Sequence, residues 1–173
     1  KKININNLIT HKSSSKSGDF FIYTYMLKDI LTIVIPCKNE GINIYDCLGL
    51  ICKQSDIEGT NVVIADSSDD ADSLYWLSRA RIDFGFSIVI HTINGGYPAK
   101  ARLNGSQLVK TPYVLFLDAD VMLRNKNLLK NIWETSLAYY EVDLVTTPFQ
   151  TETGWNWVFR VFDKFQRLST LLG

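Results

Sequence analysis

Short apolar runs alternate with segments of helical periodicity along residues 31–147, and this alternation constrains the fold more than any other feature of the chain. The apolar runs cover residues 31–35, 61–65, 87–92, 113–117 and 143–147. Runs of this length, bounded by turn residues, are typical of strands that are buried on both faces of a sheet. Because strands that alternate with helices form right-handed βαβ crossovers, the pattern predicts an α/β fold with a mostly parallel, doubly wound sheet flanked by helices.

Four segments carry apolar residues at helical spacing. Asn43, Asp70 with Asp72, and Asn127 stand at the expected starts of the first, second and fourth segments, and Pro98 stands in the first turn of the third. The third helix is expected to lie close to the sheet, because its buried face is made mostly of small residues. The expected buried faces, in order, are Ile44, Cys47, Leu48 and Ile51; Leu74, Leu77 and Ala80; Ala101, Gly105 and Leu108; and Leu129, Trp133, Ser136, Leu137 and Tyr140.

Composition indicates one globular domain. The chain has 173 residues, of which 46% are hydrophobic, so it can bury a core of ordinary domain size. Its 18 basic and 18 acidic side chains give no net charge and form no basic stripe, which argues against a nucleic-acid partner. Cys37, Cys47 and Cys52 show neither a disulfide framework nor zinc-ligand spacing, and are expected to be reduced thiols in a cytosolic setting. No run reaches the roughly 18 apolar residues of a membrane span.

Three regions follow from these patterns. We expect residues 1–28 to be a polar, partly disordered lead, residues 29–150 to form the α/β domain, and residues 151–173 to form an amphipathic helix. The sequence opens on Lys1 and stops at Gly173, so we expect the natural protein to be longer and this domain to be truncated at its C-terminal end.

The last helix has two interpretations. Residues 155–172 place apolar and aromatic side chains on one face and a net basic set of charges on the other. Such a helix can lie in a membrane interface, which would give the protein a peripheral membrane contact. It can equally pack against a part of the domain that this sequence does not contain.

Candidate binding residues follow four of the predicted strands. The carboxyl ends of parallel strands meet at one edge of the sheet, where a single ligand can contact all of the loops. The candidates are Pro36 and Glu40 after the first strand, Asp66 after the second, Lys100, Arg102 and Asn104 after the third, and Asp118 and Asp120 after the fourth.

The pair Asp118 and Asp120 points to a metal. The buried strand of residues 113–117 runs directly into these two carboxylates, and buried carboxylates are costly unless they bind something. Carboxylate oxygens suit Mg²⁺ or Mn²⁺, which complete their coordination with water and phosphate oxygens. The pattern therefore indicates a metal site for a nucleotide, although a pair of Asp residues also occurs in solvated loops.

The other candidates have structural alternatives. Glu40 could be a solvated acid at a helix start, and Asp66 or Asp69 could cap the helix that follows them. Lys100 and Arg102 could be surface charges whose apolar stems cover the domain.

Four motifs give the chain a family resemblance. They are Ile33-Val-Ile-Pro36-Cys-Lys-Asn39-Glu40, Val63-Ile-Ala-Asp66-Ser-Ser-Asp69, Lys100-Ala-Arg-Leu-Asn104-Gly and Phe116-Leu-Asp118-Ala-Asp120. Their order and spacing resemble the large family of inverting glycosyltransferases with a GT-A fold, often called family 2. The resemblance covers roughly residues 31–148, and this chain resembles the N-terminal, nucleotide-sugar-binding part of such enzymes.

The resemblance implies a hexosyltransferase-like enzyme. It would transfer a sugar from a nucleotide-diphospho-sugar donor to a hydroxyl group of a saccharide or lipid-linked acceptor, with inversion. The residues that would bind the donor are Pro36 and Glu40 in the base and ribose pocket, Asp66 as a hydrogen-bond acceptor for the base, and Lys100, Arg102 and Asn104 as further polar contacts.

The resemblance also assigns the metal. Asp118 would contact the ribose, or the metal through water, and Asp120 would ligate Mn²⁺ or Mg²⁺ directly, so that the cation offsets charge on the leaving diphosphate. An inverting enzyme needs a general base for the acceptor hydroxyl as well. Glu152 lies in the right direction along the chain but lacks the usual motif context, so we assign no base and expect this chain alone to lack it.

Two other functions remain open. One is a non-catalytic donor-binding or membrane-docking module. The other is a sugar-phosphate nucleotidylyltransferase, which is expected to have a glycine-rich basic loop after the first strand, where this chain has Pro36-Cys-Lys-Asn-Glu40. For the enzyme, we expect a cytoplasmic protein that can lie at the cytoplasmic face of the membrane through residues 155–172.

Overall fold

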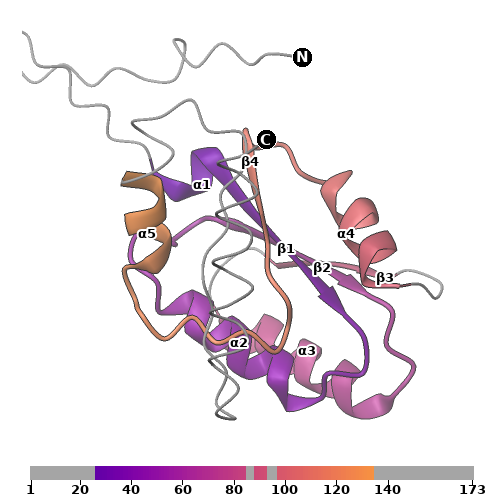
Figure 1. Cartoon of the computed structure of the whole chain (residues 1–173). Coiled ribbons are helices and arrows are strands. Elements are labelled where there is room, and N and C mark those ends of the chain that lie inside the picture. Colours follow the sequence, from indigo (N-terminus) through magenta and orange to yellow (C-terminus); the bar gives the residue numbers. More distant parts are fainter. Residues whose placement is uncertain (1–25, 85–87, 93–96, 135–173) are drawn as a thin grey trace, which may run out of the picture. The chain divides into compact units, whose positions relative to one another are not determined.

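The computed structural model describes residues 26–84, 88–92 and 97–134 (Figure 1). The chain forms two compact units, Lys1–Trp133 and Glu134–Gly173, and the fold described below is that of the first. In chain order its elements are α1 (Leu27–Ile30), β1 (Leu31–Cys37), α2 (Ile42–Cys52), β2 (Asn61–Asp66), α3 (Ala71–Asp83), β3 (Ile88–Thr92), α4 (Pro98–Ser106), β4 (Tyr113–Phe116) and α5 (Leu128–Ile132).

The strands form a parallel sheet in the order β3-β2-β1-β4. In its register Val34 of β1 lies between Val63 of β2 and Phe116 of β4. β1 lies inside the sheet, with β2 and β3 on one side of it and β4 on the other. The order in which successive strands are added therefore reverses at β1, as a doubly wound fold requires. This confirms the predicted α/β architecture. The predicted strand at residues 143–147 lies outside the described residues.

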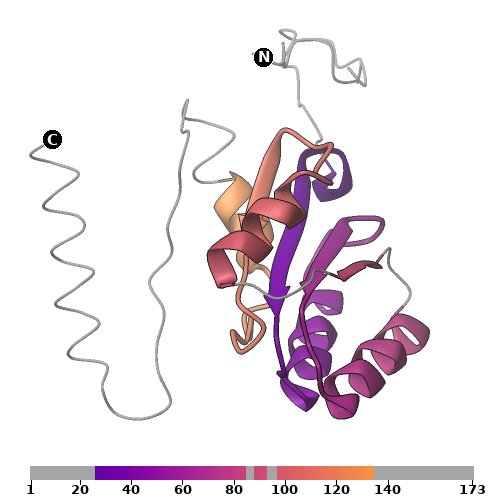
Figure 2. The same ribbon diagram turned by 90° about the vertical axis from the view of Figure 1, so that its right-hand side faces the viewer.

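Helices cover both faces of the sheet. α2 and α3 lie on one face and α4 on the other, as Figures 1 and 2 show from two directions. The first face carries Ile33, Ile35 and Ile64, which are fully buried with the apolar stripe of α2. On the second face, Ala65 packs with Ala101 of α4. The apolar runs are therefore continuous because both sides of each central strand are covered.

α4 approaches the sheet at a glycine. A Cβ atom added to Gly105 would lie 2.5 Å from Cγ1 of Val34, a distance that no real side chain tolerates. The prediction that this helix lies close to the sheet is confirmed, and Pro98 stands in its first turn as expected. Leu108 was predicted on the buried face, but the helix ends at Ser106 and Leu108 is exposed.

Two other helix details differ from the prediction. Gly41, with φ of 54°, occupies the N-cap position of α2, and Asn43 lies inside the first turn. Glycine adopts this backbone conformation without strain, and it lets the Gly41 N–H donate to Oγ of Ser73 at 2.8 Å. On α3 the buried residues are Ser73, Leu77 and Ala80, and Leu74 is 48% exposed because it lies about one position off that stripe.

The starts of the other helices follow the predicted positions. Asp70 is the N-cap of α3 and accepts a hydrogen bond from the Ser73 N–H at 2.7 Å. Asn127 occupies the N-cap position of α5 without capping it; the side chain instead accepts from Ser55 Oγ at 2.7 Å. The rest of the predicted fourth helix, beyond residue 134, lies outside the described residues.

One short helix was not predicted. α1 turns once ahead of β1 and buries Leu27 and Ile30 in the main core. None of the helices in the described part of the chain is long and apolar enough to cross a membrane. The amphipathic segment 155–172 lies outside the described residues.

Candidate functional site

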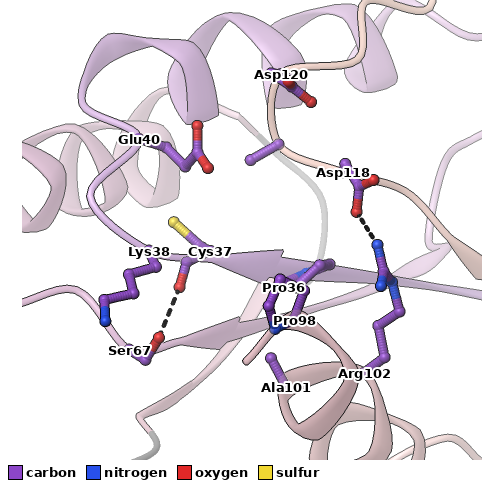
Figure 3. Close-up of a pocket in the computed structure, with 11 residues that line it drawn as sticks. Pro36, Cys37, Lys38, Glu40, Ser67, Pro98, Ala101, Arg102, Asp118 and Asp120 are labelled. Carbon is purple, nitrogen blue, oxygen red and sulfur yellow. Dashed lines mark hydrogen bonds and ion pairs between the residues drawn. The ribbon is translucent and has the colours of Figure 1, made fainter. Parts of the chain in front are cut away.

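A cavity of about 250 Å³ lies at the carboxyl ends of the strands (Figure 3). The loops after β1, β2 and β4 and the first turns of α4 surround it, as expected for an open parallel sheet. Its lining residues are Pro36, Cys37, Lys38, Glu40, Ser67, Pro98, Ala101, Arg102, Asp118, Ala119 and Asp120.

Residues 117–120, which we call the acidic segment, follow β4 and expose both predicted carboxylates. The Leu117 N–H still donates to the Val34 carbonyl at 3.1 Å, so the chain stays beside β1 past the end of β4. Leu117 and Ala119 are buried, whereas Asp118 and Asp120 are exposed. This alternation anchors the segment in the core while both carboxylates line the cavity.

Arg102 faces Asp118 across the cavity. Its guanidinium donates a hydrogen bond to Oδ1 of Asp118 and forms an ion pair with it (Figure 3). Arg102 is therefore paired with a carboxylate at the candidate site, although both side chains remain partly exposed. Lys100 is exposed and Asn104 half-buried, and neither lines the cavity.

Glu40 completes a group of three carboxylates. It is half-buried at the start of α2, and its pKa is raised by burial and by the nearby carboxylates of Asp120 and Asp118, while a hydrogen bond from Asn43 acts in the opposite direction. Burial and the neighbouring negative charge thus both disfavour the ionised form of Glu40. A cation there would be stabilised by all three groups.

These residues fit a hard divalent cation. Asp120 makes no hydrogen bond or ion pair with the described residues, so its oxygens are available as ligands. Within those residues, no three His, Cys, Asp or Glu side chains are arranged to hold a metal by themselves. Mg²⁺ and Mn²⁺ do not need such a cage, because they are commonly held by one or two carboxylates together with water and phosphate oxygens.

Side-chain hydrogen bonds join the loops after β1 and β2. Asn39, at φ of 57°, donates from its amide to Oδ1 of Asp69 at 2.7 Å and accepts from the Asp69 N–H at 3.0 Å. The Asn39 N–H donates to Oγ of Ser68 at 2.9 Å. Next to them, the Ser67 N–H donates to the Cys37 carbonyl at 2.9 Å. We call these residues the loop link, and it makes one wall of the cavity from two loops.

Asp66 lies beneath that wall, fully buried. Its Oδ1 accepts hydrogen bonds from the N–H and the hydroxyl of Ser68, at 3.0 and 2.7 Å. Its Oδ2 is buried without any partner among the described residues. The alternative that Asp66 or Asp69 caps α3 is wrong, since Asp70 does so. Asp66 does not itself line the cavity, and a buried acceptor without a donor is costly unless a ligand satisfies it.

Cys37 also lines the cavity. Burial, together with the Asp66 carboxylate, raises the pKa of its thiol to about 12, so the sulfur is neutral at physiological pH. A protonated thiol is a poor nucleophile, and Cys37 therefore serves as a small apolar part of the wall.

Sequence reasoning missed several lining residues. Lys38 and Ser67 immediately follow the ends of β1 and β2, and this position could have identified them. Pro98 and Ala101 were predicted only as helix residues, and they reach the cavity because α4 lies so close to the sheet.

Known proteins resemble this chain in sequence and structure. A poly(ribitol-phosphate) beta-glucosyltransferase of Bacillus spizizenii is 28% identical over 102 residues, which are 58% of this chain and 16% of that protein. The crystal structure of S. aureus TarS superposes with a TM-score of 0.52 and 25% identity, over 61% of this chain and 19% of TarS. A structure of TarS 1–349 in complex with UDP gives the same TM-score and identity, over 61% of this chain and 31% of that one. The chain thus spans less than a third of the length of these relatives.

A family model decides the classification. The model for Glycosyl transferase family 2 matches residues 32–169, which include nearly all of the sheet and the whole cavity described above. The matching structures share the parallel sheet and its flanking helices. The chain therefore belongs to glycosyl transferase family 2 and has the α/β architecture of the GT-A fold.

Proposed function

We propose that this domain binds a nucleotide-diphospho-sugar and a divalent cation in the cavity, and that the natural protein transfers the sugar to a hydroxyl acceptor with inversion. The single observation that carries the proposal is the convergence of Glu40, Asp118 and Asp120 on one cavity at the carboxyl ends of the strands. Family membership makes a glycosyl transfer the reaction to consider, and the complex of TarS 1–349 with UDP supports a nucleotide as the ligand.

Different parts of the donor would contact two walls of the cavity. Asp66 would accept a hydrogen bond from the base through Oδ2, which has no donor within the described residues. Because Asp66 has no exposed surface, the base would reach it only after a small adjustment of the loop link. Pro36 and Glu40 would border the nucleoside, with Glu40 also next to the carboxylates that would hold the cation, and Arg102 would supply positive charge near the phosphates.

The opposite wall would hold the cation. Asp120 would bind Mn²⁺ or Mg²⁺ directly, and Asp118 would assist through water or contact the ribose. When bound, the cation supplies Lewis-acid stabilisation of the diphosphate that leaves. The protein's own contribution is to keep these two carboxylates aimed at the cavity. We assign no general base within the described residues.

The test is nucleotide binding with and without metal. Thermal shifts of the chain with UDP, GDP, dTDP and CDP should show stabilisation by at least one nucleotide that grows when Mn²⁺ replaces EDTA, because a ligand of the folded state raises its stability. Asp120→Asn should remove the metal-dependent part and leave the circular dichroism spectrum unchanged, since Asp120 is exposed. Glu58→Gln, an exposed acid outside the cavity lining, is the matched control. Nucleotide affinity that is equal with Mn²⁺ and with EDTA would refute the metal assignment.

A further inference from the structure

The segment after Asp120 needs support that its own backbone does not provide. β4 ends at Phe116 and α5 begins only at Leu128, so the carbonyl groups between them have few partners in regular structure. Three turn hydrogen bonds of 3.0 Å lie within the segment: the N–H groups of Val121, Arg124 and Leu128 donate to the carbonyls of Asp118, Met122 and Asn125, and none of them reaches the buried Leu123. Buried carbonyl groups beyond these turns must find hydrogen-bond donors elsewhere, because leaving them unsatisfied is costly.

Gln54 provides those donors. It follows the end of α2 closely, and its side chain is buried. Its amide nitrogen donates to the Leu123 carbonyl at 3.1 Å and to the Asn125 carbonyl at 2.9 Å. Its amide oxygen accepts from the Leu129 N–H at 3.3 Å. One buried side chain therefore uses both of its N–H donors and its acceptor on residues 123–129.

Neighbouring contacts act on the same segment. The Ser55 N–H donates to the Lys126 carbonyl at 2.7 Å, and Ser55 Oγ donates to Asn127 Oδ1 at 2.7 Å. Asp56 forms an ion pair with Lys130 at 3.0 Å, but both side chains are exposed and such a pair contributes little. The buried part of the attachment is therefore Gln54, and its first bond, to Leu123, lies three residues after Asp120.

α2 connects this attachment to the cavity. Glu40 lies just before the helix, at its cavity end, and Gln54 follows the helix at its other end. The acidic segment is thus held by Val34 through the Leu117 N–H on one side and by Gln54 through Leu123 on the other. Between these two anchors lie Asp118 and Asp120.

We propose that Gln54 is a positioning residue for the metal site: it sets where Asp120 stands relative to Glu40 without touching the ligand. The inference rests on the proposed function, because it concerns the same cation. It predicts that loss of the three Gln54 hydrogen bonds weakens metal-dependent nucleotide binding far more than metal-independent binding. The hydrogen bonds of the loop link and of Asp66 do not involve Gln54. The wall that these residues form, which would face the base and is called the base wall below, would therefore stay intact.

The experiment compares Gln54→Leu with the unaltered chain. Leucine keeps most of the volume and removes all three hydrogen bonds. Binding of UDP and of GDP is titrated by calorimetry in Mn²⁺ and in EDTA, and bound Mn²⁺ is counted by electron paramagnetic resonance in the presence of each nucleotide. We expect Mn²⁺ affinity to fall about 10- to 100-fold, the range seen when groups that orient metal ligands are removed. Affinity in EDTA should stay within about twofold, because the base wall is unaltered.

Controls separate positioning from general destabilisation. Leu77→Ala opens the core under α3, away from the acidic segment, and should lower the melting temperature while leaving Mn²⁺ affinity unchanged. Gln54→Asn keeps an amide that is one methylene too short, so it provides a milder variant if the leucine variant does not fold. It should show the same selective loss of Mn²⁺ affinity.

The outcomes are distinct. If the unaltered chain binds nucleotide more tightly with Mn²⁺ and the folded Gln54 variants do so equally well, the role of Gln54 is refuted while the proposed function stands. If the unaltered chain shows no effect of Mn²⁺, the metal site and the role of Gln54 are both refuted. If Leu77→Ala loses Mn²⁺ affinity to the same extent as the Gln54 variants, the loss reflects stability and the positioning role is refuted.

Discussion

Arg102, on the second turn of α4, forms an ion pair with Asp118, which follows β4. Both elements lie beside Val34 of β1, α4 through Gly105 and β4 through Phe116, and both residues of the pair line the cavity. A guanidinium in this place stands where a cation bound to Asp118 would stand. On the proposed function, Arg102 and the metal would therefore compete for this carboxylate unless the donor's phosphates draw the guanidinium away.

Removal of this guanidinium should release Asp118. In Arg102→Ala, Mn²⁺ without nucleotide should bind about two- to fivefold more tightly, the range expected for an exposed ion pair. UDP or GDP should bind more weakly, because the positive charge near the phosphates is lost. Electron paramagnetic resonance measures the first effect and calorimetry the second. Arg102→Lys keeps the charge, so its affinities for Mn²⁺ and for nucleotide should lie between those of the unaltered chain and of Arg102→Ala. A Mn²⁺ affinity that does not rise in Arg102→Ala would contradict the competition.

Glu40 predicts a pH dependence. Its pKa is raised above the ordinary value of 4.5 in the folded state, so the folded protein holds a proton that the unfolded chain releases. Charged Glu40 is therefore unfavourable at neutral pH, and stability falls as the pH rises from 4.5 through the raised pKa. Glu40→Gln should raise the melting temperature at pH 7 and have no such effect below the ordinary pKa.

The same prediction has an internal control. Asp120→Asn removes one of the two charges that raise the Glu40 pKa, so the pKa of Glu40 should move down toward its ordinary value. Carbon-detected NMR titration of the Glu40 carboxyl group measures this directly. A Glu40 pKa that is the same in both proteins would show that Asp120 does not face it.

The close approach of α4 predicts a steric effect. Gly105→Ala places a methyl group 2.5 Å from Cγ1 of Val34, so the helix must move away from the sheet. Overpacking of this kind costs about 1–3 kcal/mol, which urea unfolding measures. Because Arg102 is carried by the same helix, nucleotide affinity should fall as well.

Gly49→Ala in α2 is the matched control. Its added Cβ would meet the rim of the Phe84 ring at 3.2 Å, a smaller overlap. The better helix propensity of alanine, about 1 kcal/mol, should offset that contact. Equal destabilisation by both substitutions would contradict the steric argument for Gly105.

Asp66 predicts which bases bind. A carboxylate oxygen only accepts hydrogen bonds, so Oδ2 favours a base that presents an N–H at its pairing edge. Uracil, thymine and guanine present a ring N–H there, whereas the ring nitrogen of cytosine carries a lone pair and only its exocyclic amino group donates. CDP should therefore bind more weakly than the preferred nucleotide, by up to about tenfold, because an oxygen that accepts from the cytosine amino group also lies near the lone pair of the ring nitrogen. Competitive calorimetry checks the order, and CDP binding as tightly as both UDP and GDP would refute the role of Asp66.

Much of the fold could be predicted because its causes are local. The apolar run before Asp118 identifies β4, and the position of Pro98 identifies the start of α4. Gly41 escaped prediction because its backbone conformation is tied to Ser73, a residue of another helix. Leu74 was misplaced because the i, i+3 spacing alone does not say which of two neighbouring stripes faces the core.

Some residues of the site could likewise be predicted from local sequence, and others could not. Asp118 and Asp120 could be predicted from the apolar strand that precedes them, although β4 is not buried as expected, since Val114 and Phe116 are exposed. The contact of Asn39 with Asp69 could not, because it joins residues 30 positions apart and exists only in the observed register of β1 and β2. The role of Gln54 was hidden for a similar reason, since its partners lie 69 to 75 positions along the chain.

The loop link and the Gln54 attachment share no residue. The loop link and the acidic segment are therefore held by separate sets of hydrogen bonds, although residues of both line the same cavity. Substitutions in the loop link therefore leave the hydrogen bonds of Gln54 in place. Within the loop link, Asn39 and Asp69 must change together, because each satisfies the other's hydrogen bonds. On the proposed function, base preference would therefore belong to the pair of loops and not to either loop alone.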